Sequence, residues 1–130
     1  MKLFIDVNVL VSVLNKEYPV FTHAARILSL AGQNYHQLYT SPLCIAIAFY
    51  FATKKSGQQQ AKKKIRILTQ HLHIAPCLED GVEKTVNNPK ILDMEDGIQY
   101  YAALEAGCTT IITEDLNDFW FSEVEILNCE

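Results

Sequence analysis

The sequence has no long apolar run, no paired-cysteine motif and, across residues 93–119, not one lysine or arginine. A membrane-spanning helix needs about 18 consecutive apolar residues, and no stretch approaches that length. Asp6 and Asn8 interrupt the apolar start of the chain, residues 1–19, and no small-residue cleavage site follows them. We therefore interpret this start as a buried strand and a helix, not as a signal peptide, and expect no contact with a membrane.

Disulfide and zinc motifs are also missing. The four cysteines stand far apart in the chain, without CxxC or zinc-finger spacing: Cys44, Cys77, Cys108 and Cys129. This pattern favours buried free thiols. Free thiols are typical of the reducing cytoplasm, where we expect the protein to be located.

Size and composition are those of one globular domain, residues 1–130, with 49% apolar and 20% charged residues. The net charge of −4 is unevenly distributed: six of the eleven basic residues lie in 54–66, and thirteen of the fifteen acids lie in 79–130. A partner or substrate would respond to this dipolar layout more than to the mean charge.

Apolar patterns typical of strands alternate with patterns typical of helices. The predicted strands are 2–6, 37–41, 71–76, 109–113 and 124–127, and the predicted helices are 8–14, 21–31, 42–54, 58–70, 78–86 and 94–106. Asn8 and the Ser41-Pro42 pair are the expected helix starts, and Gly32 and Gly107 the expected stops. The alternation predicts an α/β fold: a three-layer α/β/α sandwich with a central, mostly parallel sheet of about five strands.

Acids gather where such a sheet collects functional groups, at the carboxyl ends of its strands. Asp6 ends the first strand, Asp115 and Asp118 follow the fourth, and Asp96 begins the helix that leads into it. Carboxylates that converge without basic neighbours repel one another unless a cation joins them. Oxygen ligands suit Mg²⁺ or Mn²⁺, and such an ion can activate water against a phosphodiester.

Each acid also has an ordinary structural interpretation. Asp93 is a plausible N-cap, Glu95 is best explained by solvation in the first turn, and Asp96 fits capping and function about equally. Asp115 and Asp118 are common turn residues. Asp6 is hardest to explain structurally, because an acid ending an apolar strand needs a partner.

Four blocks of the sequence, in order along nearly the whole chain, resemble the PIN-domain family, and in particular its VapC-like nuclease branch: FIDVNVL, SPLCIAIAFYF, MEDGIQYYAALEAGCTTIIT and TEDLNDF. The resemblance implies an α/β/α sandwich and a Mg²⁺- or Mn²⁺-dependent ribonuclease. Many small bacterial members are toxins of toxin–antitoxin pairs. The resemblance therefore also implies RNA as substrate, an inhibiting antitoxin protein as partner, and a homodimer.

The resemblance assigns roles residue by residue. Three aspartates match the metal-binding acids, a fourth matches a further catalytic acid, and two polar residues match the groups that orient water: Asp6, Asp96 and Asp115, then Asp118, then Asn8 and Thr113. Two positions depart from the family. Val7 replaces the usual Thr, and Ile47 replaces the Glu that normally supplies the second acid.

Ile47 leaves a second function open, because an aliphatic side chain binds neither metal nor water. The alternative is a PIN-like binding or assembly module with weakened or absent catalysis.

Two further features have open interpretations. A basic stretch could follow an RNA backbone, although we favour a solvated helix face as its explanation: Lys62, Lys63, Lys64 and Arg66. In the aromatic run 118–121 we expect Trp120 to be buried, whereas an exposed Trp120 would mark a surface for a partner.

Overall fold

The computed structural model describes residues 1–17, 20–29 and 36–129. Its centre is a sheet in which every strand pairs in parallel, in the order β3-β2-β1-β4-β5. The strands are β1 (Lys2–Ile5), β2 (Gln37–Thr40), β3 (His73–Ile74), β4 (Thr110–Ile112) and β5 (Glu125–Leu127). The predicted parallel sheet of about five strands is confirmed.

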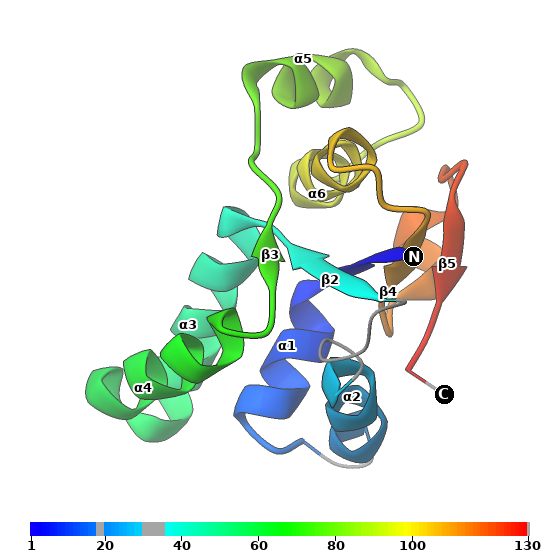
Figure 1. Ribbon diagram of the computed structural model, residues 1–130. Coiled ribbons are helices and arrows are strands. Elements are labelled where there is room, and N and C mark those ends of the chain that lie inside the picture. Colours follow the sequence, from blue (N-terminus) through cyan, green and yellow to red (C-terminus); the bar gives the residue numbers. More distant parts are fainter. Residues whose placement is uncertain (18–19, 30–35, 130) are drawn as a thin grey trace.

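Helices cover both faces of this sheet. They are α1 (Val7–Leu14), α2 (Val20–Ser29), α3 (Pro42–Ser56), α4 (Gln58–Thr69), α5 (Glu79–Asn87) and α6 (Met94–Glu105), with a 3₁₀ turn η2 (Leu116–Phe119). Figure 1 shows α1 and α2 on one side of the sheet and α5 and α6 on the other, which confirms the α/β/α sandwich. The predicted end of the second helix at Gly32 lies outside the described residues.

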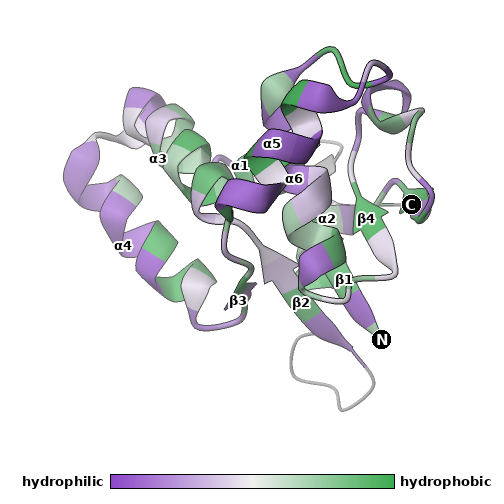
Figure 2. Ribbon diagram, turned by 90° about the horizontal axis from the view of Figure 1, so that it is seen from above, coloured by the Kyte–Doolittle hydropathy of each residue, from purple (hydrophilic) through white to green (hydrophobic). Residues whose placement is uncertain are grey.

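The strands at the centre of the sheet form the core. Phe4 and Ile5 of β1 and Ile111 of β4 are fully buried, as expected for strands covered on both faces. In Figure 2, α3 is mostly hydrophobic in colour and α4 mostly hydrophilic. All four cysteines are free, as predicted, and three of them are buried.

The helix starts follow local capping chemistry, with one correction. The Ser41 hydroxyl accepts a hydrogen bond from the Cys44 amide at 3.1 Å, and Pro42 occupies the first turn of α3, as predicted. The predicted cap at Asn8 is wrong: Asp6 caps α1, because it is extended and its carboxylate accepts from the Val7 amide. Asn8 already lies inside the helix, which leaves its side chain free for other bonds.

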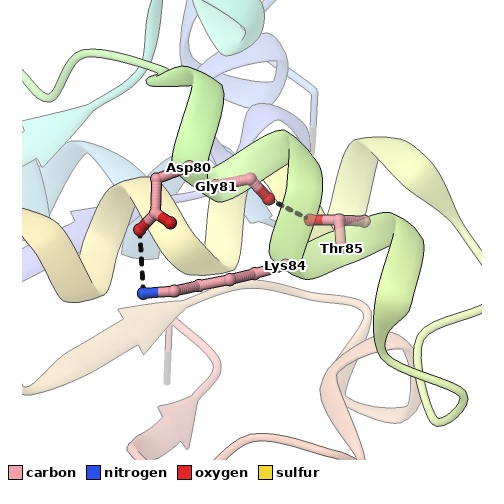
Figure 3. Close-up of polar contacts among 4 residues, drawn as sticks. All are labelled: Asp80, Gly81, Lys84 and Thr85. Atoms are coloured by element: carbon pink, nitrogen blue, oxygen red, sulfur yellow. Dashed lines mark hydrogen bonds and ion pairs between the residues drawn. The ribbon is translucent and has the colours of Figure 1, made fainter.

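Helix α5 packs closely on α6 through a glycine. A Cβ at Gly97 would overlap the Thr85 and Ile91 side chains, so only glycine allows this approach. The Thr85 hydroxyl donates to the Gly81 carbonyl at 2.8 Å, and Lys84 pairs with Asp80 at 2.9 Å (Figure 3). Gly107, with a φ of +83°, ends α6 as predicted. The start of α6, which carries Asp96, is thereby held closely against α5.

Candidate active site

The candidate site lies where the strand order of the sheet reverses. Strand β1 pairs with β2 on one side and with β4 on the other, so the chain builds the sheet outward from β1 in two directions. Ligands of open α/β sheets bind beyond the carboxyl ends of the strands at such a switch point. Asp6 directly follows β1, and Thr113 directly follows β4.

Asp6 is held rigidly at this point and is only 4% exposed. One carboxylate oxygen accepts from the Val7 amide at 2.7 Å, and the other accepts from the Thr113 hydroxyl at 2.8 Å. Burial raises the pKa of Asp6 from 3.8 to about 6, although both hydrogen bonds oppose the rise. The nearby charges of Glu95 and Asp115 raise that pKa further. An ionised Asp6 is therefore costly in this position unless a cation is bound beside it.

Asn8 joins the two strand ends through its amide. Its Nδ2 lies 2.9 Å from Asp115 Oδ2, 3.2 Å from Thr113 Oγ1 and 3.4 Å from Asp6 Oδ2. Its Oδ1 accepts from the Glu114 amide at 3.2 Å. The two hydrogens of the Asn8 amide group are thus shared among three acceptor oxygens. Asp6 and Asp115, more than a hundred positions apart in the sequence, bind the same amide group.

Thr113 completes this network from inside the core. Its hydroxyl donates to Asp6 and accepts from the Asp115 amide at 3.0 Å. The side chain is fully buried, so its orientation is fixed by these bonds. The predicted neighbourhood of Asp6, Asn8, Thr113 and Asp115 is therefore present in the structure.

Asp96 approaches from the start of α6. Its amide donates to the Asp93 carboxylate at 3.0 Å, which makes Asp93 the N-cap, as predicted. The Asp96 side chain is half-buried, and burial raises its pKa to about 7. The charges of Asp93, Asp118, Asp6 and Glu95 add to the rise. Asp96 therefore lies within electrostatic reach of the acids on the other two elements.

Asp118 stands at the open side of the site, on the exposed turn η2. Partial burial raises its pKa, and the charges of Asp115 and Asp93 raise it further. Asp118 and Asp96 line a common hollow. The four aspartates of the sequence analysis thus border one region.

Glu95 belongs to this region as well, although its place in the first turn of a helix predicted solvation and no function. It is half-buried, and its Oε1 accepts from the amide of Gln99 at 3.1 Å. Gln99 is fully buried, one turn along α6. The pKa of Glu95 is raised, mainly by burial. The spacing of four between Glu95 and Gln99 is the one sequence signal that could have indicated this tethered carboxylate.

Helix α3 borders the site without contributing an acid. Burial raises the pKa of the Cys44 thiol to about 12, and the charge of Asp6 adds to the rise, so the first turn of α3 lies near Asp6. Ile47 is half-buried one turn further along. No acid occurs between Pro42 and Ser56.

The donor set fits a hard divalent cation in its chemistry. Every candidate ligand is a carboxylate or amide oxygen, and burial, with a smaller effect of neighbouring carboxylates, raises the pKa values of Asp6 and Asp96. Among the described residues, no three His, Cys, Asp or Glu side chains stand together as a formed metal cage. An ion would therefore draw the carboxylates inward from where they lie.

Among the described residues, none of the basic residues of α4 forms an ion pair with these acids. Lys62, Lys63 and Arg66 are exposed. Lys64 is half-buried, and its ammonium donates to the Leu14 carbonyl at 3.1 Å and to the Ser56 hydroxyl at 3.0 Å. Lys64 thus ties α4 to the end of α1, a role that the sequence stretch does not reveal.

Trp120 differs from expectation. It is 65% exposed, whereas its neighbour Phe119 is 2% exposed and packs in the core. The prediction of burial is wrong: Phe121 on the other side also packs partly buried against the core, and the Trp120 ring between them is left exposed. Within the described part of the chain, no helix is long and apolar enough to span a bilayer.

Comparison with known proteins shows the family of this chain. A model of the PIN domain family matches residues 2–117. Ribonuclease VapC1 of Aquifex aeolicus is 26% identical over 133 residues, which cover 99% of this chain and 91% of that protein.

Solved structures share the fold. VapBC2 of Rickettsia felis, bound to a DNA fragment from its promoter, superposes with a TM-score of 0.76 at 17% identity, with 98% of each chain covered. VapC20 of Mycobacterium tuberculosis, described as a sarcin-ricin loop cleaving toxin, gives a TM-score of 0.71 at 15% identity, with 94% of this chain and 98% of that chain covered. The chain belongs to the PIN domain family, as its four sequence blocks predicted.

Proposed function

We propose that this chain is a divalent-metal-dependent endoribonuclease that hydrolyses RNA phosphodiester bonds, and that it is the toxin of a toxin–antitoxin pair. The observation that carries the proposal is the uncompensated group of carboxyls. Asp6 and Asp96 have pKa values raised to about 6 and about 7. Among the described residues, neither they nor Asp115 pair with a basic side chain. A bound cation would remove that cost.

Each polar residue has a separate task in this proposal. Asp6, Asp96 and Asp115 would hold Mg²⁺ or Mn²⁺, which when bound supplies an activated water and polarises a phosphoryl oxygen. Asn8 and Thr113 hold the Asp6 and Asp115 carboxylates in fixed orientations through the bonds described above. Hydrogen bonds from a second layer of residues orient metal ligands in this way.

Asp118 is the group best placed to move the proton. It lies exposed on η2 beside Asp96, and its pKa is raised. As the water oxygen bonds to phosphorus, Asp118 accepts the proton that the water loses. The bond from phosphorus to the leaving oxygen breaks, and that oxygen takes a proton from solvent.

Glu95 supplies the acid that α3 lacks. Ile47 removes the usual carboxylate from one side of the site, and Glu95 adds one from α6, held by the buried Gln99. The proposal therefore keeps four carboxylates around the ion. Replacement of Glu95 by Gln should weaken Mn²⁺ binding in calorimetry, whereas a Glu105→Gln change at the far end of α6 should not.

The partners follow from the relatives and from the charge layout. The relatives named above are a ribonuclease, a toxin and a member of a VapBC complex, which supports RNA as substrate and an antitoxin protein as partner. Lys62, Lys63 and Arg66 offer an exposed basic face to phosphates. The exposed aromatic residues Tyr50 and Phe51 of α3 offer an apolar face for a homodimer.

The direct test is cleavage of RNA by the purified protein with Mg²⁺ or Mn²⁺. An Asp6→Asn variant should lose cleavage and keep its fold. Asp80→Asn is the matched control, because Asp80 lies on α5 and pairs with Lys84 outside the site. Equal cleavage by both variants would exclude Asp6 from the chemistry.

Ile47 favours a second candidate function, a PIN-like binding or assembly module without catalysis. The discriminating measurement is calorimetry with millimolar Mn²⁺. Absence of binding, together with intact RNA after long incubation, would support the module and exclude the nuclease.

A further inference from the structure

A hollow of about 180 Å³ adjoins the acids on their open side. Two segments form its walls: the loop before α6 with the first turn of that helix, and the turn η2 with the residues after it. Asp96 and Asp118 line this hollow together with Lys90, Leu92 and Trp120. Any molecule in the hollow would therefore lie directly beside the proposed site of cleavage.

Two large apolar side chains of this hollow are exposed to water. Trp120 is 65% exposed and Leu92 is 91% exposed. The Trp120 ring is nevertheless supported by its neighbours. The Phe121 ring contacts it edge to face, with the ring centroids 6.3 Å apart, and Phe119 on the other side is buried. An exposed aromatic ring on a fixed support is characteristic of a binding surface.

The chemistry of the hollow favours a nucleobase over an apolar peptide. The remaining lining includes the charged groups of Lys90, Asp96 and Asp118, which a covering peptide would have to bury. A base offers a flat face to the indole and polar edges to the surrounding groups. The phosphate attached to the base is negatively charged and supplies an ion-pair partner for the Lys90 ammonium. Among the described residues, the Lys90 ammonium has no ion-pair partner.

We propose that Trp120 is a stacking platform for one base of single-stranded RNA, next to the phosphodiester that is cleaved, and that Lys90 binds a phosphate of the same strand. This inference rests on the proposed ribonuclease function and adds the substrate contact on the open side of the site. Stacking on an aromatic ring tolerates every base, so Trp120 selects single strands over duplexes without reading the sequence.

The intrinsic fluorescence of the protein reports on Trp120 alone, because Trp120 is the one tryptophan in the sequence. The experiment is a fluorescence titration of the wild-type protein in EDTA, which prevents metal-dependent cleavage, with a short oligouridylate. An abasic oligomer of equal length is the control. The proposal expects the oligouridylate to quench the emission and the abasic oligomer to leave it unchanged, since only the former can stack.

Affinity is then measured with labelled RNA by anisotropy, so that variants without tryptophan can be compared. Trp120→Ala should weaken binding about 5- to 150-fold, the contribution of one stacked base. Lys90→Ala should weaken binding to all sequences alike and lower the salt slope by about one. Val86→Ala is the control: Val86 is 64% exposed and does not line the hollow, so affinity should not change.

Three results would overturn the inference: RNA that binds without quenching, a Trp120→Ala variant that binds RNA like wild type, or quenching that only a protein partner produces. The proposed function fails differently. If RNA quenches Trp120 fluorescence but is never cut with Mn²⁺, the stacking platform is supported and the nuclease function is refuted. If wild type and Trp120→Ala bind and cut single-stranded RNA equally, the nuclease function is supported and the stacking platform is refuted.

Discussion

Replacement of Asp6 by Asn tests the electrostatic basis of the site without RNA. Folding raises the pKa of this buried carboxyl from 3.8 to about 6. That difference corresponds to a loss of about 3 kcal/mol in the free energy of unfolding of the metal-free protein when Asp6 is ionised. A carboxyl with a raised pKa holds its proton more tightly in the folded state. The penalty is therefore absent below about pH 4, grows up to about pH 6, and is complete above it.

Asn keeps the shape of the side chain and removes the charge. Its oxygen can still accept from the Val7 amide, but its NH₂ group would face a Thr113 hydroxyl that already accepts from the Asp115 amide and from Asn8. We expect one hydrogen bond to be lost there, at a cost of about 1 kcal/mol. In EDTA, Asp6→Asn should thus be about 2 kcal/mol more stable than wild type at pH 8, and about 1 kcal/mol less stable at pH 4.

Urea denaturation at the two pH values measures both differences, and the Asp80→Asn variant provides the baseline for loss of an exposed charge. Added Mn²⁺ should raise the midpoint of wild type at pH 8 and leave Asp6→Asn unchanged, because only a ligand bound to the folded state stabilises it. If Asp6→Asn is equally destabilised at pH 4 and pH 8, ionised Asp6 carries no penalty and the reasoning is refuted.

Three other predictions concern the surroundings of the site. Ile47→Glu should strengthen Mn²⁺ binding by about tenfold in calorimetry, since it adds a charged ligand from α3; an unchanged affinity would place this position out of reach of the ion. Gly97→Ala should destabilise the protein by about 1–3 kcal/mol through overlap with Thr85 and Ile91, and Thr85→Ser should recover part of that loss in urea denaturation. Lys64→Met should cost about 1–3 kcal/mol, because the end of α1 loses a charged donor, whereas the exposed Lys62→Met should change stability by less than about 0.5 kcal/mol.

Much of the fold could be predicted from local patterns, because each element is recognisable from its own residues. Ser41 and Pro42 begin α3 and Gly107 ends α6, and both signals act within a few positions. The short apolar run of β1 and that of β4 identify central strands for the same reason. What these patterns could not give is the position of the α1 cap, since Asp6 and Asn8 both suit that role.

The parts of the site that escaped prediction depend on contacts between distant segments. Glu95 in the first turn of a helix is ordinarily solvated, and only the packing of α6 on the sheet brings it within the field of Asp6. The same applies to Lys64, whose bond to Leu14 requires α4 to lie against the end of α1. The exposure of Trp120 escaped prediction for a local reason. It depends on which of three successive aromatic rings, at 119–121, the chain directs into the core.

Asn8 shows how closely fold and site depend on one another. Its single amide reaches both Asp6, directly after β1, and Asp115 beyond β4, which is possible because neighbouring strands lie only about 4.8 Å apart. One intervening strand would place the two acids about 10 Å apart, beyond the reach of one side chain. The strand order at the switch point therefore creates the acid pair, and the amide in turn fixes β1 to β4. A change at Asn8 should consequently alter stability and metal affinity together, whereas a change at the exposed Asp118 should leave stability unaltered.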